Sequence, residues 1–151
     1  MPEAGALAGI DFGTVRVGIA ITDPGRILAS PLETFQRLPQ RELEARYFQK
    51  LVQDYQLVGF VVGLPVHSSG EESQKSSEAR AFGAWLGEAT QLPICFFDER
   101  YTTQHAHRLL GESGRSRKKR KESLDKIAAQ ILLQSYLDAG PHAADLGPAS
   151  M

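Results

Sequence analysis

Apolar and polar residues alternate near the start of the chain with the period of half-buried β-strands. Between residues 15 and 22 the apolar side chains occupy every second position, at Val15, Val17, Ile19 and Ile21. We expect strands at about 7–12 and 15–22 joined by a tight turn, and a third at about 27–35, where Pro31 favours an edge or a bulge. The chain is therefore predicted to begin with three antiparallel strands.

Farther along, the apolar period changes to that of helices, and two short apolar runs between them are typical of buried parallel strands. The expected strands cover about 57–62 and 93–99, and the expected helices about 40–55, a segment around 79–89, 103–111 and 123–138. This order predicts an α/β fold with a mixed five-stranded sheet, three antiparallel strands and then parallel strands, flanked by helices. We expect a single domain over 1–139 and a flexible tail over 140–151.

Composition changes this picture little. The 151 residues include one cysteine, Cys95, in an apolar run, so we expect a small core residue, no disulfide and a reducing, cytoplasmic location. No segment is long and apolar enough to predict a membrane span, and we expect no membrane partner.

Charge is distributed unevenly. Six of the seven residues at 115–121, RSRKKRK, are basic, which leaves 11 basic and 18 acidic residues elsewhere in a chain of net charge −1. A cationic segment on an otherwise acidic protein predicts contact with a polyanion at one place. The alternative is a solvated loop.

Three acidic positions stand within apolar patterns: Asp11, the pair Asp98–Glu99, and Asp125. Each has a structural explanation. Asp11 could form an Asx-type turn, Asp98 could cap the following segment, and Asp125 could lie in the first turn of a helix beginning at Ser123, where the helix dipole favours a carboxylate.

A joint explanation is also open, because the first strand, the parallel strands and the last helix could bring these carboxylates to one point. Clustered carboxylates need cations near neutral pH, and hard divalent ions such as Mg²⁺ or Mn²⁺ suit oxygen ligands. Such ions support phosphoryl chemistry, and the basic run beside Asp125 would bind a phosphodiester backbone. The combination indicates a nuclease.

Several ordered motifs resemble the YqgF (RuvX) family of the ribonuclease H-like superfamily. The similar segments are GIDFGTVRVGIAITD at 9–23, ASPLETF at 29–35, VVGLPVHSSG at 61–70, LPICFFDERYTTQHA at 92–106 and KRKESLDKIAAQILLQSYLD at 119–138. The resemblance implies a ribonuclease H-like fold and metal-binding carboxylates at Asp11, within 98–100 and at Asp125. It also implies a nuclease that processes the 5′ end of the 16S ribosomal RNA precursor, and resolution of four-way DNA junctions has been proposed for the family.

Within this frame, Asp11, Glu99 and Asp125 are predicted metal ligands and catalytic residues, with Asp98 as the alternative to Glu99, because strand alternation places those two on opposite faces. Substrate contacts are expected from Arg16, Arg100, Lys118, Lys119, Arg120 and Lys121. For Arg16, a solvated strand arginine is an equal alternative. Either a monomer or a homodimer is compatible with this prediction.

Two other functions remain open. Asp11-Phe-Gly-Thr14 resembles the phosphate-binding turn of actin-like ATPases, but those proteins need two such domains and this chain has the length of one. A non-catalytic RNA-binding assembly factor would explain the basic run and leave the three carboxylates without a role.

Overall fold

The computed structural model describes residues 1–65, 73–102 and 117–140. Its strands are β1 (Ala6–Phe12), β2 (Arg16–Thr22), β3 (Ala29–Gln36), β4 (Leu57–Leu64) and β5 (Ile94–Asp98). Its helices are α1 (Arg41–Tyr55), α2 (Gln74–Thr90) and α4 (Arg117–Ala139), with a single 3₁₀ turn, η1 (Glu99–Tyr101). The strands form one sheet in the order β3-β2-β1-β4-β5.

Pairing within the sheet follows the prediction. β1 pairs antiparallel with β2, and β2 with β3, whereas β1, β4 and β5 run parallel. β3 is an edge strand, and its register slips by one residue beside Pro31, where Ile19 pairs with Glu33 but Ala20 pairs with Pro31. Both features expected of Pro31 are present, since proline cannot donate to a sheet ladder.

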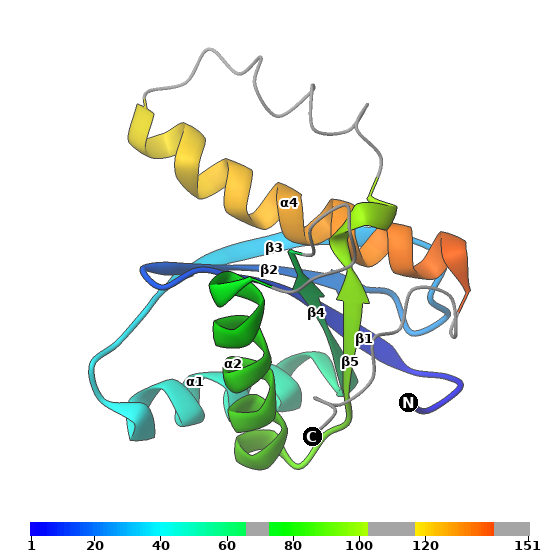
Figure 1. Ribbon diagram of the computed structural model, residues 1–151. Helices are drawn as coiled ribbons and strands as arrows, with labels where there is room; N and C mark the ends of the chain where they lie inside the picture. The colour runs from blue at the N-terminus through cyan, green and yellow to red at the C-terminus, as the bar shows by residue number, and fades with distance from the viewer. Residues whose placement is uncertain (66–72, 103–116, 141–151) are drawn as a thin grey trace.

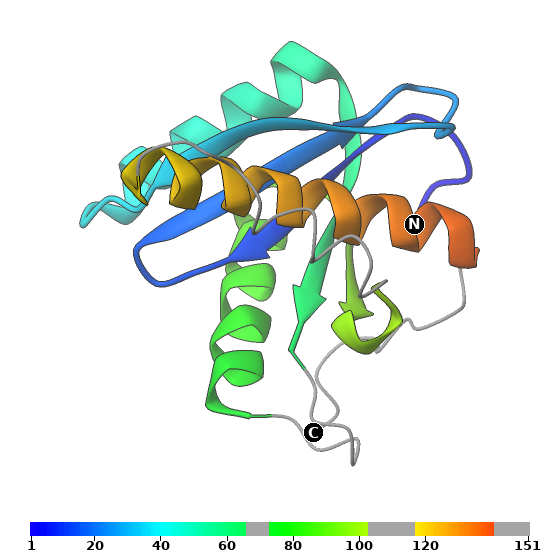
Figure 2. The same cartoon turned by 90° about the horizontal axis from the view of Figure 1, so that it is seen from above.

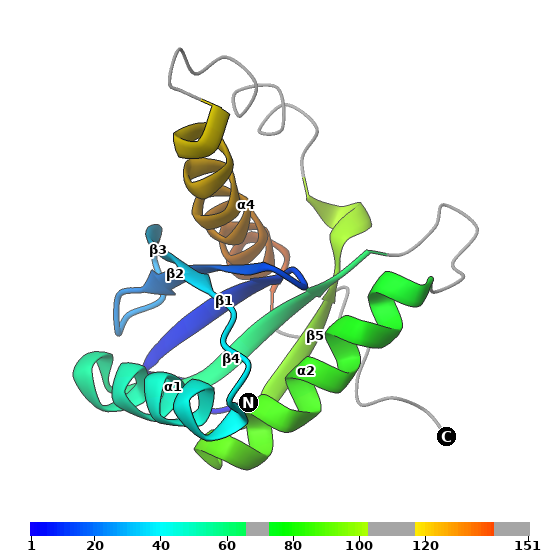
Figure 3. The ribbon, with the colours of Figure 1, turned by 90° about the vertical axis from the view of Figure 1, so that its left-hand side faces the viewer.

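Helices cover both faces of the sheet. α1 and α2 lie on one face and α4 on the other, as Figures 1 and 3 show. Residues alternate between two apolar cores along each strand: in β1, Ala8 and Ile10 pack toward α1 and α2, whereas Leu7 packs toward α4. Cys95 is a buried member of the core beneath α4, as predicted.

Glycines let α4 lie very close to the sheet. A Cβ on Gly9 would stand 2.8 Å from the Cβ of Leu133, and one on Gly18 would overlap the main-chain carbonyl of Asp125. α4 therefore lies across β2 and β1 (Figure 2). Asp125 lies above Gly18 of β2, and Leu133 lies above Gly9 of β1. This close packing fixes the position of the Asp125 main chain.

One predicted boundary is wrong: α4 begins at Arg117, not at about residue 123. Ser123 is therefore no N-cap, and Asp125 lies roughly two turns inside the helix, beyond the reach of the dipole at its first turn. The residues from Arg117 to Lys121 belong to a helix, so the loop interpretation of this stretch is also wrong. α4 begins early because lysine, arginine and glutamate are all good helix formers.

Two predicted elements, the helix at 103–111 and the tail beyond 140, lie almost wholly outside the described residues. Within the part of the chain that the structure describes, no helix is long and apolar enough to cross a membrane.

Candidate active site

The carboxyl ends of three parallel strands, β1, β4 and β5, meet at one edge of the sheet. A hollow of about 740 Å³ opens there, lined by Asp11, Glu99, the turn after β1 and the first turns of α2. In open α/β sheets, this edge is where ligands bind. The remaining lining residues are Phe12, Gly13, Thr14, Gly63, Pro65, Gln74, Lys75, Glu78 and Ala79.

Asp11 and Glu99 lie on the same face of the sheet. Asp11 follows Leu7 and Gly9 in the alternation of β1, and both of these face α4. A Cβ on Gly63, which also faces α4, would stand 2.6 Å from Glu99 Oε1, so the Glu99 carboxylate lies directly over β4. The glycine makes room for this carboxylate between β1 and β5.

Asp98 has a different environment. Its side chain is only 2% exposed, and both of its carboxylate oxygens accept hydrogen bonds from Arg100 Nε, at 3.0 and 2.9 Å. The Arg100 main-chain amide adds a third bond at 2.9 Å, so Asp98 also caps η1, as its structural interpretation expected. This ion pair engages Arg100, whose predicted contact with substrate stays a prediction.

Asp125, in α4, lies near enough to Asp11 for its charge to act on it. Its main chain lies over Gly18, and Gly18 pairs with Asp11 in the β1–β2 register. Asp125 Oδ2 accepts a hydrogen bond from Arg16 Nε at 2.7 Å, and both side chains are about a quarter exposed. The solvated-arginine interpretation of Arg16 is therefore wrong, and its role toward substrate stays a prediction.

The electrostatics of the site centre on Asp11. Burial, followed by the negative charges of Glu99 and Asp125, raises the pKa of Asp11 to about 7. Burial, with a smaller contribution from the charge of Asp98, also raises the pKa of Glu99. Both carboxyl groups are held where ionisation is unfavourable without a nearby cation.

Glu44, on α1, is a buried carboxylate that, unlike Asp11, is neutralised by a neighbouring arginine. It is completely buried, and Arg37 binds it through two nitrogens, at 2.8 and 3.2 Å, while the Leu38 amide donates a third hydrogen bond. Although burial alone would raise the pKa of Glu44, these bonds lower it below its usual value. Within the described residues, Asp11 has no such permanent cationic partner.

A divalent ion is the cation that these donors suit. Asp11, Glu99 and Asp125 offer only carboxylate oxygens, the ligands that Mg²⁺ and Mn²⁺ prefer. In residues 1–65, 73–102 and 117–140, however, no three acidic, histidine or cysteine side chains stand close enough together to hold an ion directly. The three carboxylates are the right kind of ligand for a divalent ion. In this structure, however, the Asp125 carboxylate is paired with Arg16.

Lys75 is a lining residue that no sequence pattern indicated. It is the only basic residue lining the hollow in the described part of the chain, and it lies in the first turn of α2, two residues after the N-cap Ser73. Its position in a polar segment entering a helix gave no signal of this placement. The side chains of Lys118, Lys119, Arg120 and Lys121 lie outside the described residues.

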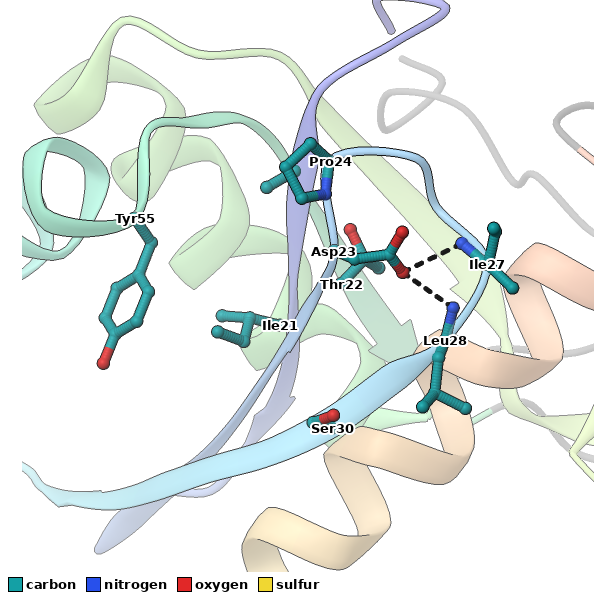
Figure 4. A pocket seen from close by; sticks show the side chains of 9 residues that line it. Ile21, Thr22, Asp23, Pro24, Ile27, Leu28, Ser30 and Tyr55 are labelled. Atoms are coloured by element: carbon teal, nitrogen blue, oxygen red, sulfur yellow. Dashed lines mark hydrogen bonds between the residues drawn. The ribbon is translucent and has the colours of Figure 1, made fainter.

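A second hollow, of about 540 Å³, lies at the opposite end of β1 and β2 (Figure 4). Its walls are mostly apolar, and its one carboxylate, Asp23, accepts hydrogen bonds from the amides of Ile27 and Leu28 at 3.0 and 2.8 Å. Its described lining holds no group of ionisable side chains. The first hollow is therefore the candidate active site.

Comparisons with known proteins identify the family of this chain. The family model RuvX, described as Holliday junction resolvase, matches residues 5–139. A Rhodopirellula baltica protein named "Putative pre-16S rRNA nuclease" is 47% identical over 145 residues, 96% of this chain and 83% of that protein. A Rhodobacter capsulatus protein of the same name is 42% identical over 142 residues, 94% of this chain and 89% of that protein.

Among solved structures, the fold is similar to Thermus thermophilus RuvC in complex with Holliday junction substrate, with a TM-score of 0.58 and 15% identity over 93% of this chain and 98% of that one. A second structure of Thermus thermophilus RuvC gives a TM-score of 0.51 at 14% identity, covering 88% of this chain and 95% of that one. The predicted ribonuclease H-like α/β fold is confirmed. On the extent of these matches, the chain belongs to the RuvX family.

Proposed function

We propose that this protein is a metal-dependent nuclease that processes the 5′ end of pre-16S ribosomal RNA. The observation that carries the proposal is a buried carboxylate, Asp11, set beside two further carboxylates and without a permanent cation among the described residues. Glu44, by contrast, is a buried carboxylate outside the site, and it forms an ion pair with Arg37. The nuclease names of relatives at 42–47% identity point to the same activity.

In this proposal, Asp11, Glu99 and Asp125 hold Mg²⁺ or Mn²⁺. When bound, such ions lower the pKa of a coordinated water and stabilise the leaving oxygen of a phosphodiester. The protein's part is to hold the carboxylates through the packing of Gly18 and Gly63. Lys75 and the basic residues at 117–121 bind backbone phosphates near the site.

A four-way DNA junction is the second candidate substrate. The family description names Holliday junction resolvase, and the similar RuvC structure contains such a junction. Symmetric cleavage of a junction needs two active sites, so this alternative requires a homodimer.

Cleavage of a labelled panel tests the proposal. The panel contains a pre-16S-like RNA, single-stranded RNA, single-stranded DNA and a four-way DNA junction, each with Mg²⁺, Mn²⁺ or chelator. We expect the native protein and the control Asp23→Asn to cut, and Asp11→Asn and Glu99→Gln not to cut. The preferred substrate distinguishes RNA processing from junction resolution.

Two results would contradict the proposal. Cleavage by Asp11→Asn, or cleavage in chelator, would show that these carboxylates do not bind a metal needed for cleavage. Equal nucleic-acid binding by all proteins with no cleavage would favour a non-catalytic RNA-binding assembly factor.

A further inference from the structure

The contact between Arg16 and Asp125 joins the candidate metal site to the candidate substrate surface. Arg16 lies at the start of β2 and Asp125 in α4, 109 residues apart in the chain. Their side chains meet at 2.7 Å with only about a quarter of each exposed. An ion pair at this distance and burial is a specific contact, unlike a loose surface pair.

The Asp125 carboxylate can change partners only by rotating its side chain. Its main-chain carbonyl is pressed against Gly18, so α4 cannot withdraw there without losing its packing on the sheet. Gly18 is also the register partner of Asp11. From this main-chain position, the Asp125 carboxylate binds Arg16 and is also close enough for its charge to act on Asp11.

A divalent ion held by Asp11, Glu99 and Asp125 would have to compete with Arg16. A guanidinium is permanently charged and cannot yield by losing a proton. It repels a nearby divalent cation, and it occupies Oδ2 of one of that cation's three carboxylates. Among the described residues, no three acidic, histidine or cysteine side chains stand close enough together to hold an ion directly, so Asp125 would have to leave Arg16 to join such a site.

We propose that Arg16 is an exchangeable counter-ion of Asp125, displaced by the divalent ion and then free to bind a phosphate of the substrate. The proposal rests on the metal-dependent nuclease proposed above. Metal binding would thereby free a positive charge for the substrate. The freed guanidinium would lie beside α4, which runs from Asp125 back toward Arg117 past this end of β2 (Figure 2).

The first test measures Mn²⁺ binding by isothermal titration calorimetry, without nucleic acid. Arg16→Gln removes the charge, Arg16→Lys keeps it, and Lys50→Gln, on the exposed side of α1, removes a charge far from the site. We expect Arg16→Gln to bind Mn²⁺ about tenfold more tightly than the native protein. Arg16→Lys and Lys50→Gln are expected to stay near the native value.

The second test measures coupling between metal and nucleic acid, with a fluorescein-labelled four-way DNA junction and Ca²⁺ in place of Mn²⁺. In chelator, native protein and Arg16→Gln are expected to bind the junction equally, because Arg16 is then occupied by Asp125. With Ca²⁺, the native protein is expected to bind several-fold more tightly than Arg16→Gln, since coupling between two ligands is reciprocal.

The outcomes separate this proposal from the proposed function. Weaker Mn²⁺ binding by Arg16→Gln would show that Arg16 orients Asp125 for the metal, and equal binding would show no competition; either result overturns the exchange and leaves the nuclease standing. If no variant binds Mn²⁺ and none cuts nucleic acid, the metal-dependent nuclease itself is overturned, and the exchange with it.

Discussion

Replacing Asp11 by asparagine is expected to stabilise the protein at neutral pH. The pKa of Asp11 is about 7 in the folded protein, against an ordinary value of 3.8. Between those values the folded protein keeps a proton that the unfolded chain has lost, so stability falls as pH rises, and the full cost is present above pH 7. A shift of about three units corresponds to about 4 kcal/mol, which is an upper bound because the site relaxes.

Asparagine preserves the shape of the side chain and carries no charge at any pH. We therefore expect Asp11→Asn to raise the free energy of unfolding by about 2 kcal/mol at pH 8, or the melting temperature by about 6 °C for a domain of this size. The gain should shrink through pH 6 and disappear near pH 4. The difference in unfolding free energy is measured by urea unfolding in chelator, with circular dichroism as the signal.

Divalent metal provides the complementary measurement. Mg²⁺ at saturating concentration should raise the melting temperature of the native protein and leave that of Asp11→Asn almost unchanged, because ligands stabilise only the state that binds them. A stability difference between the two proteins that does not vary with pH, or a less stable Asp11→Asn at pH 8, would refute the reasoning.

Asp23 supplies a control of opposite sign. A hydrogen bond from the Leu28 amide, assisted by that from Ile27, lowers the pKa of Asp23 (Figure 4). The ionised carboxylate therefore contributes stability above its ordinary pKa of 3.8, which is lost as pH falls through the lower folded value. Asp23→Asn should destabilise the protein at pH 8, with the difference shrinking in acid.

Three further changes test other parts of the structure. Gly18→Ala forces a Cβ into the Asp125 carbonyl, so we expect a loss of about 3 kcal/mol in urea unfolding together with loss of cleavage. Arg37→Gln leaves Glu44 buried without its cation and should cost about 3 kcal/mol, with nuclease activity retained at temperatures where the protein is folded. Glutamine at the basic positions of 115–121 should weaken nucleic-acid binding and flatten its dependence on salt, as fluorescence anisotropy would measure.

The strands and their alternating faces could be predicted from the sequence because period-two alternation is a local property, whereas the order β3-β2-β1-β4-β5 came only from the structure. Once Leu7 and Gly9 face α4, Asp11 must face it as well. The same alternation separates Asp98 from Glu99, but only the packing of β5 on α4 shows which of them shares the face of Asp11. That choice depends on contacts between segments far apart in the chain.

Other features had no local signal. The start of α4 was misplaced because a dense basic run looks like a loop, although each of its residues is compatible with a helix. Arg16 pairs with Asp125 across 109 residues of the chain, and the sequence around neither residue predicts this contact. Lys75 reaches the hollow only through the placement of α2 against the end of β4.

Because α4 is continuous from Arg117 to Ala139, the basic segment and Asp125 share one rigid axis. Lys118 precedes Asp125 by seven residues, which corresponds to about 10 Å along a helix and about two turns. The helix therefore sets both the spacing and the angular phase between the main-chain positions of the basic residues and that of Asp125, which the proposed function assigns to substrate and to metal. One residue inserted between them would turn the two sets about 100° out of phase, so, if the proposed function holds, we expect the length of this helical segment to determine where along a strand the protein cuts.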